Sequence, residues 1–163
     1  METPPRVSFP AAWVPGGESA ARPSPVLPIC HRLVLIASGS GLLALLLVAL
    51  SLEPDPRGLG THQQLGLPPC TVRALYAIRC PSCGMTTAWS HLVRGQILAA
   101  CRANVGGALV CLGAMLLGPR AILSGLRGKW LGRAITPHTA AWAAVLVLGV
   151  TLTDWIVRLL IDR

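Results

Sequence analysis

The chain is short of charged and of aromatic side chains. Only 12% of its 163 residues are charged, about half of the roughly 25% that soluble domains carry, and 4% are aromatic. The 14 Lys and Arg residues outnumber the six Asp and Glu residues, which gives a net charge of +8. With five Trp, one Tyr and one Phe in the chain, no basic groove interleaved with aromatic residues appears, as it does in nucleic-acid-binding surfaces. The sequence therefore predicts the lipid bilayer as the partner, and no nucleic acid.

The sequence also lacks the common catalytic and cofactor-binding motifs. It has no glycine-rich phosphate loop and no C-x2-C-H motif for haem attachment. The histidines form no H-x3-H or H-E-x-x-H pair, which argues against a metal site made of histidine alone. Ser90 and His91 are adjacent, so on a helix they do not face each other as a nucleophile and its base would. These absences favour a protein that is not an enzyme.

What the sequence does contain is long apolar runs, within a composition that is 53% hydrophobic. The residues from Leu33 to Leu52 carry no charge, and a helix of this length crosses a hydrocarbon core of about 30 Å. Further spans are predicted at about 103–126 and 139–161. The predicted fold class is an all-α integral membrane protein with about three transmembrane helices.

Two segments lie outside these spans. Residues 1–29 hold seven of the 14 prolines, and we expect a disordered tail because this composition cannot bury enough apolar surface to fold. Residues 30–163 are expected to form one membrane domain. Within it, residues 70–100 carry a cysteine motif and a short amphipathic helix from Pro81 to about Ala100. This helix is too polar to span the membrane alone and is expected to lie at its surface.

Positive charge is concentrated at the end of the second predicted span and in the short loop that follows it. The basic residues there are Arg120, Arg127, Lys129 and Arg133. Because cytoplasmic loops are enriched in Lys and Arg, this loop and the N-terminus are predicted to be cytoplasmic. One crossing then places the cysteine motif on the extracytoplasmic side. Three spans leave little room for a central transport path, so a transporter would have to be a homo-oligomer.

The motif Cys80-Pro81-Ser82-Cys83-Gly84 is predicted to begin the amphipathic helix. Pro81 suits the first helical position, where its missing N–H costs nothing. The backbone N–H groups of a helix start favour thiolates and lower thiol pKa values. Gly84 leaves room for another backbone to approach. The polar side chains predicted to share one helical face with Cys83 are Thr86, Thr87, Ser90 and Arg94.

Three interpretations of the cysteines remain open. In the first, Cys70, Cys80 and Cys83 are metal ligands, with zinc as the metal and His91, His62 or a water as the fourth ligand. In the second, Cys80 and Cys83 are the redox pair of a membrane thiol–disulfide oxidoreductase, with Cys70 as a third, exchanging thiol. In the third, the cysteines are structural and hold the helix start against the membrane. Zinc sites commonly combine a C-x2-C pair with a second pair of Cys or His ligands. A C-x2-C pair without the second pair does not decide among the three interpretations.

At these residues the chain resembles the DUF2752 family, small bacterial membrane proteins of unknown function whose hallmark is C-P-x-C-G-x-T-R-A. The resemblance covers about residues 66–158. The matching residues are Cys70, Cys80, Pro81, Cys83, Gly84, Thr86, Ala88, Arg94, Gly95, Ala103, Asn104, Trp155 and Arg158. The resemblance implies a helical protein of the bacterial inner membrane and brings no established reaction with it.

The chain departs from this family at Thr87, where many members carry Arg. If that Arg pairs with an anion or orients a thiolate, Arg94 on the same helical face is the residue left for the role. Near the C-terminus, Asp154 and Arg158 are four residues apart with the acid first, the favourable order for a helical ion pair. Because they lie near the end of the third span, we expect an interfacial ion pair rather than a buried proton site.

Overall fold

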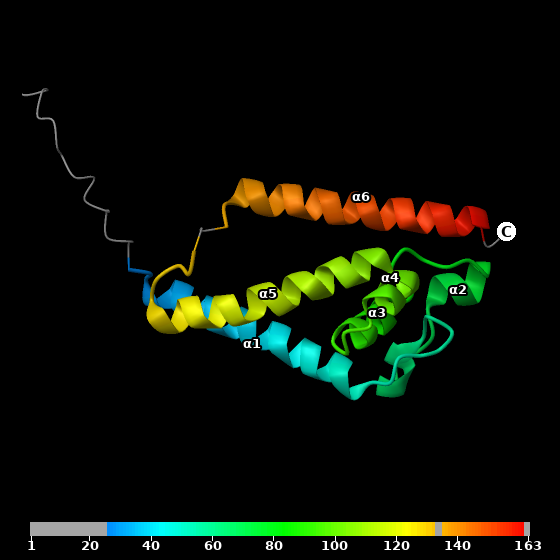
Figure 1. The fold of residues 1–163 in the computed structure, drawn as a ribbon, viewed down its shortest axis with the longest axis horizontal. Coiled ribbons are helices and arrows are strands. Elements are labelled where there is room, and N and C mark those ends of the chain that lie inside the picture. The colour runs from blue at the N-terminus through cyan, green and yellow to red at the C-terminus, as the bar shows by residue number, and fades with distance from the viewer. Residues whose placement is uncertain (1–25, 133–134, 162–163) are drawn as a thin grey trace, which may run out of the picture.

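The computed structural model describes residues 26–132 and 135–161, and all of the regular structure in them is helical. This confirms the predicted all-α fold class. Most of the predicted Pro-rich tail lies outside the described residues, as does Arg133. The elements are α1 (Ile29–Ser51), the 3-10 helix η1 (Thr61–Leu65), α2 (Thr71–Tyr76), α3 (Met85–Leu92), α4 (Ile97–Ala103), α5 (Val105–Arg127) and α6 (Pro137–Ile161), as shown in Figure 1.

Three of these helices, α1, α5 and α6, are long and apolar enough to cross a membrane. Helix α5 packs against both of the others (Figure 1). Pro119 lies inside α5, which continues past it as a helix to Arg127. The order of the elements places the start of α1 and the α5–α6 connection at one end of the bundle, and the cysteine motif at the other.

Glycines allow α1 and α5 to approach each other closely. A Cβ atom on Gly39 would lie 2.7 Å from the carbonyl oxygen of Gly118, and one on Gly125 would lie 2.8 Å from that of Arg32. Both separations are shorter than carbon–oxygen contact, so larger side chains would push the helices apart. Close approach of backbones through small residues is typical of helix pairs in membranes.

Helix α6 has a different environment from α5. None of its described residues is buried, although Thr151 packs directly against Gly106 of α5. Several of its apolar side chains, such as Leu146 and Leu160, are more than half exposed. In a chain with three apolar helices of spanning length, this exposed apolar surface is where lipid would be in contact.

The amphipathic helix expected from Pro81 to about Ala100 is divided in two. Helix α3 ends at Leu92, Gly95 follows with φ +76°, and α4 begins at Ile97. A left-handed residue cannot continue a helix, so the chain reverses and the two short helices form a hairpin. Buried alanines join this hairpin to α5; they are Ala88, Ala100, Ala103 and Ala108.

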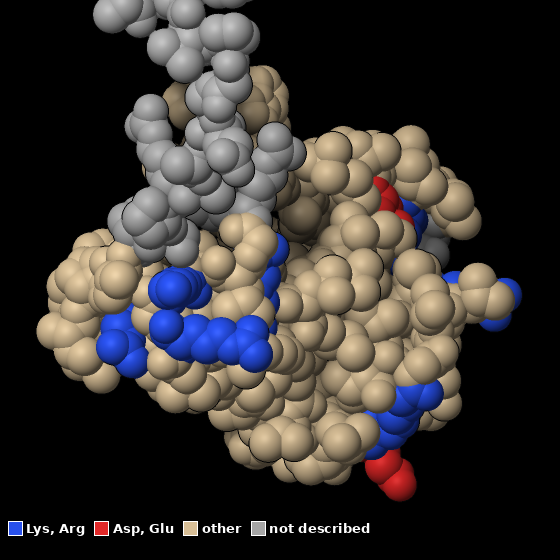
Figure 2. All heavy atoms as spheres, turned by 60° about the vertical axis from the view of Figure 1, so that its left-hand side comes forward, with Lys and Arg blue, Asp and Glu red and all other residues tan. Residues whose placement is uncertain are grey.

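We call the two ends of the bundle the cysteine end (residues 52–104 and the C-terminal part of α6) and the basic end (the start of α1 and residues 120–132). At the basic end, Arg32 donates hydrogen bonds to the carbonyl oxygens of Gly125 (2.8 Å) and Leu126 (3.1 Å), near the C-terminus of α5. Figure 2 brings this end forward and shows Lys and Arg side chains gathered on it. Unpaired carbonyls and the helix dipole both favour a cation there.

Candidate metal centre

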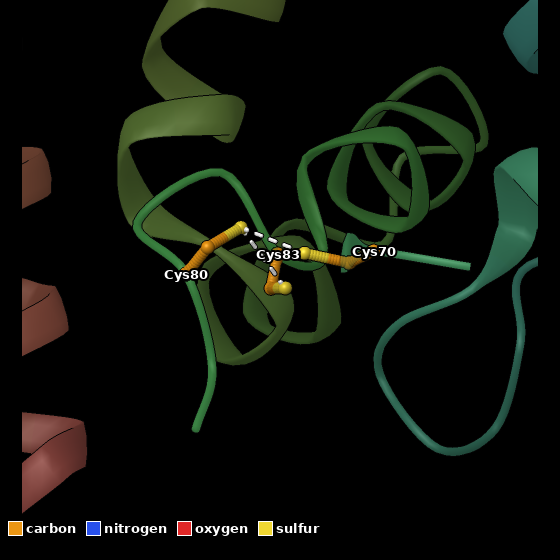
Figure 3. A group of neighbouring side chains, drawn as sticks. All are labelled: Cys70, Cys80 and Cys83. Carbon is orange, nitrogen blue, oxygen red and sulfur yellow. Dashed lines mark hydrogen bonds between the residues drawn. The ribbon is translucent and has the colours of Figure 1, made fainter. Parts of the chain in front are cut away.

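Cys70, Cys80 and Cys83 form a cluster at the cysteine end, and all three are free thiols. The Cys80 Sγ atom lies 3.5 Å from that of Cys70 and 3.1 Å from that of Cys83. The three sulfur atoms all lie within 4.8 Å of one another. Figure 3 shows the three side chains pointing toward a common point, with the Cys80 sulfur linked to both others. The structure therefore brings together the three residues that the sequence predicted as metal ligands.

The local backbone presents the thiols from a loop rather than from a helix start. Cys70 is the N-cap residue of α2, and the N–H of Cys83 donates to the carbonyl of Cys80 (3.0 Å) in a tight turn. Helix α3 starts only at Met85, after Gly84 with φ +86°. The prediction that Pro81 is the first helical residue and that Cys83 lies in the first helical turn was therefore wrong. The left-handed Gly84 ends the turn and directs α3 away from it.

Two close contacts fix this turn against the start of α5. Asn104 is buried, and its Nδ2 donates to the carbonyls of Pro81 (2.9 Å) and Cys83 (3.1 Å). Its Oδ1 accepts from the N–H of Gly107 (2.7 Å), so the same side chain also caps α5. A Cβ on Gly84 would lie 2.6 Å from the Ala103 carbonyl oxygen. This is the backbone approach that the sequence predicted for Gly84.

Helix α6 anchors the other side of the cysteine loop. The indole Nε1 of Trp155 donates to the carbonyl of Arg79 (2.6 Å), the residue before Cys80. Arg158 forms an ion pair with Asp154 (2.8 Å) and donates to the carbonyl of Arg102 (2.7 Å), at the C-terminal end of α4. The predicted helical ion pair is thus present, and its arginine also satisfies carbonyls at a helix end.

Burial and backbone hydrogen bonds set the acidities of two of the thiols in opposite directions. Burial raises the pKa of Cys83 to about 12. A hydrogen bond from the backbone N–H of Arg73, followed by one from Cys80, lowers the pKa of Cys70. The sequence predicted a lowered pKa at the C-x2-C pair. That prediction was wrong for Cys83, because desolvation disfavours its thiolate and no helix begins at it.

A cavity of about 510 Å³ opens beside the thiols. His62, Arg57 and Arg73 are among its lining residues, and no Asp or Glu of the described residues lines it. Soft thiolates without carboxylates select zinc or copper(I) over calcium and magnesium, which require oxygen ligands. The donor set therefore fits a soft metal ion with three sulfur ligands and a fourth position open to the cavity.

The polar face predicted on α3 serves several purposes. Thr86 and Thr87 both line the cavity, and Thr87 is fully buried and shares a 2.8 Å hydrogen bond with Thr61. Ser90 donates to the carbonyl of Ala49 (2.9 Å) near the C-terminus of α1. Arg94 donates to the same carbonyl (3.3 Å) and to that of Leu50 (2.6 Å). Because Arg94 is bound to carbonyls of α1, it does not take the thiolate-orienting role suggested for it.

The sequence pattern did not reveal the roles of Asn104 and Trp155. Asn104 matches the family only as the opening of a span, although an Asn just before an apolar helix is a signal for an N-cap. Trp155 is part of the same resemblance, and no sequence signal indicates which carbonyl its indole binds. Of the two histidines predicted as a fourth ligand, His62 lines the cavity, whereas His91 is hydrogen-bonded to Gln96 (2.6 Å).

The fold and the site together define a helical membrane protein with a three-cysteine site at one end of its bundle. Residues 70–118 match the model of the DUF2752 family, which is described as a protein of unknown function. This match confirms the suspected family over residues 70–118, which include all three clustered cysteines. No curated protein and no solved structure matches the chain.

Proposed function

We propose that this protein is a membrane-anchored zinc-binding protein in which Cys70, Cys80 and Cys83 hold the ion. The observation that carries the proposal is the convergence of three free thiols, from two separate loops, within 4.8 Å. Zinc bonds to sulfur at about 2.3 Å, which places the sulfurs of a tetrahedral site roughly 3.8 Å apart. The observed separations of 3.1 and 3.5 Å lie close to that spacing, so small side-chain rotations would complete the site.

His62 is the best candidate for the fourth ligand. It lines the same cavity, and its Nε2 lies 3.2 Å from the carbonyl of Pro68. A carbonyl only accepts, so Nε2 carries a proton, and in the neutral tautomer the lone pair for a metal is on Nδ1. Zinc-bound histidines commonly donate their other N–H to a backbone carbonyl, which fixes their orientation. Three thiolates and an imidazole make the Cys3His set of structural zinc sites.

The packing of α2 indicates what the metal would do for the fold. Helix α2 packs against none of the other helices in the described part of the chain. Its side chains are exposed, and Leu75 and Tyr76 are about 70% accessible. Cys70, at its N-cap, reaches the thiols of the neighbouring turn. A zinc ion would therefore bond α2 and its loop to the α3–α4 hairpin, a connection that apolar packing does not provide.

Metal analysis of the detergent-purified full chain tests this proposal. We expect zinc in the wild-type protein and in Cys30→Ser, a control that removes an exposed thiol from the basic end. We expect zinc to be lost from Cys83→Ser, and retained with weaker affinity in His62→Ala. Zinc-free protein whose three clustered thiols are freely alkylated would contradict the proposal. Zinc that binds equally well in Cys83→Ser would contradict the ligand assignment.

A membrane thiol–disulfide oxidoreductase is the second candidate, favoured by the position of Cys80 within 3.5 Å of both other thiols. In this reaction the Cys80 thiolate attacks a partner disulfide and forms a mixed disulfide. Cys83 then displaces the second partner thiol, so the partner is reduced and Cys80–Cys83 is oxidised. Cys83→Ser should accumulate the mixed disulfide. Failure of both the wild type and this variant to exchange with a model disulfide would exclude this candidate.

The proposal also includes an orientation, with the basic end in the cytoplasm and the cysteine end outside. The bias of Lys and Arg toward cytoplasmic loops supports it. At the cysteine end, part of the positive charge is used inside the fold, since Arg57 is paired with Asp55 and Arg94 binds carbonyls of α1. Membrane-impermeant maleimide applied to bacterial cells after zinc removal should label Cys70 and spare Cys30. The reverse pattern would overturn the orientation.

A further inference from the structure

A second cavity lies between α2 and the C-terminal part of α6, outside the cysteine site. Its volume of about 430 Å³ falls within the roughly 300–1,000 Å³ typical of small-molecule sites. Arg73, Arg79 and Arg158 line one part of it, and Ile156, Leu159 and Leu160 line another. No acidic side chain of the described residues lines it. The cavity is thus cationic and apolar at once.

The arginines of this cavity differ in what they already bind. Arg158 already binds Asp154 and carbonyls at the end of α4. It therefore forms part of the cavity wall, but its charge is largely paired and contributes little to ligand binding. The Arg73 side chain, in contrast, forms no hydrogen bond or ion pair with the described residues, and Arg73 is exposed. A guanidinium at the rim of an apolar cavity is suited to bind a phosphate in bidentate geometry.

The apolar side of the cavity continues the lipid-facing surface of α6. Ile156 is 51% and Leu160 is 69% exposed, near the end of a helix of spanning length. Across the cavity, α2 exposes Leu75 and Tyr76, and such apolar and aromatic side chains near basic residues are typical of helices in the headgroup region. With α6 across the membrane, a cavity at this end of the helix would lie at the depth of phospholipid phosphates, with acyl chains beside α6.

We propose that this cavity binds an anionic phospholipid, whose phosphate headgroup contacts Arg73 and Arg79 and whose acyl chain lies along Ile156 and Leu160. Two features of the lining support this occupant over a soluble anion: the arginines complement the phosphate, and the apolar side chains complement the acyl chain. Arg73 also lines the cysteine cavity. A bound lipid would thus hold α2 through Arg73, in addition to the contact that Cys70 makes at the cysteine site.

Photocrosslinking in nanodiscs tests the site, because it maps the lipid to a peptide. The full chain is reconstituted with photoactivatable phosphatidylglycerol, and labelling of the α6 peptide around Ile156–Leu160 is measured by mass spectrometry. Two basic residues near a membrane surface contribute enough attraction that Arg73→Gln/Arg79→Gln should lower this labelling roughly 30-fold when the probe is limiting. Arg73→Lys/Arg79→Lys should restore most of it.

Matched controls separate this site from general attraction of anionic lipid. Arg127→Gln/Lys129→Gln removes two charges from the basic end and should leave labelling of the α6 peptide unchanged. A phosphatidylcholine probe should label this peptide weakly. Equal labelling by both probes, or no effect of the Arg73/Arg79 double variant, would overturn the proposal. Competition by millimolar inorganic phosphate that abolishes the labelling would overturn the lipid as occupant in favour of a free phosphate. None of these outcomes depends on bound zinc.

Discussion

The two ends of the bundle are built from the same long helices but are held together in different ways. At the basic end, α1 and α5 meet through close glycine contacts, and Arg32 binds the last carbonyls of α5. At the cysteine end, short helices and loops are fixed by directional bonds from Asn104, Trp155, Arg94 and Arg158. Long apolar helices need little more than packing. Short polar segments bury too little apolar surface for that and rely on hydrogen bonds.

Gly84→Ala should be the single substitution that damages the cysteine end most. A left-handed φ and a Cβ 2.6 Å from the Ala103 carbonyl oxygen combine at this position, so we expect a loss on the order of 3 kcal/mol and loss of zinc. Gly66→Ala is the matched control, because Gly66 has φ +76° but nothing within 4 Å. It should cost only about 1 kcal/mol. Unfolding in detergent measures both, and equal losses would contradict the clash.

Asn104→Ala removes the donor from two carbonyls of the cysteine turn and the acceptor from the N–H of Gly107. Because these groups are buried, we expect a loss of about 2 kcal/mol in stability and zinc affinity weaker by roughly 10- to 100-fold. Competition with a chromophoric chelator measures the affinity. Ser38→Ala, an exposed hydroxyl on α1, is the control and should change neither quantity. Unchanged zinc affinity in Asn104→Ala would show that the hydrogen bonds from Asn104 do not position the thiols.

Zinc affinity at the cysteine end should rise with pH. Burial raises the pKa of Cys83 to about 12, so its thiol is protonated near neutrality and must lose a proton to bind the metal. We expect about tenfold tighter binding per pH unit for each thiol still protonated. A chelator titration at several pH values checks this. An affinity independent of pH would contradict thiol ligation.

In the metal-free protein, the sign of the pH effect on stability is opposite. The pKa of Cys83 is higher in the folded state than the ordinary value of 9.0, so its contribution to stability is fully present below about pH 9. It is lost as the pH rises toward 12. Cys83→Ser should not show this part of the alkaline destabilisation, which denaturant unfolding at increasing pH would detect.

Arg94→Met and Arg32→Met compare the two ends directly and should have the smallest effects. Each arginine donates to two carbonyls near the C-terminus of a long helix, α1 for Arg94 and α5 for Arg32. Each substitution should cost about 1 kcal/mol of stability. Only Arg94→Met should also weaken zinc binding, because α3 follows the cysteine turn. A zinc affinity lowered equally by both would mean that the two ends are not independent.

Much of the fold could be predicted from the sequence because it depends on local composition. Uncharged runs predicted the three long helices, and α1 was placed within a few residues of its observed ends. The helix at the cysteine motif was predicted to start too early and to run without a break. Gly84 and Gly95 are both left-handed and interrupt it, and a continuous amphipathic pattern does not show which glycine takes that conformation.

For the candidate site, sequence spacing by itself determined that Cys80 and Cys83 would be neighbours. They are three positions apart, and the first and fourth residues of a tight turn lie close together. The sequence also determined the apolar helices, because their length and high apolar content need no tertiary context. Only the tertiary structure decided that Cys70 joins the pair, that Asn104 clamps their turn, and that Trp155 reaches a carbonyl 76 residues away. These contacts depend on how α5 and α6 pack beside the α3–α4 hairpin. Helix packing in turn depends on the fit between side-chain surfaces of residues that are far apart in the sequence.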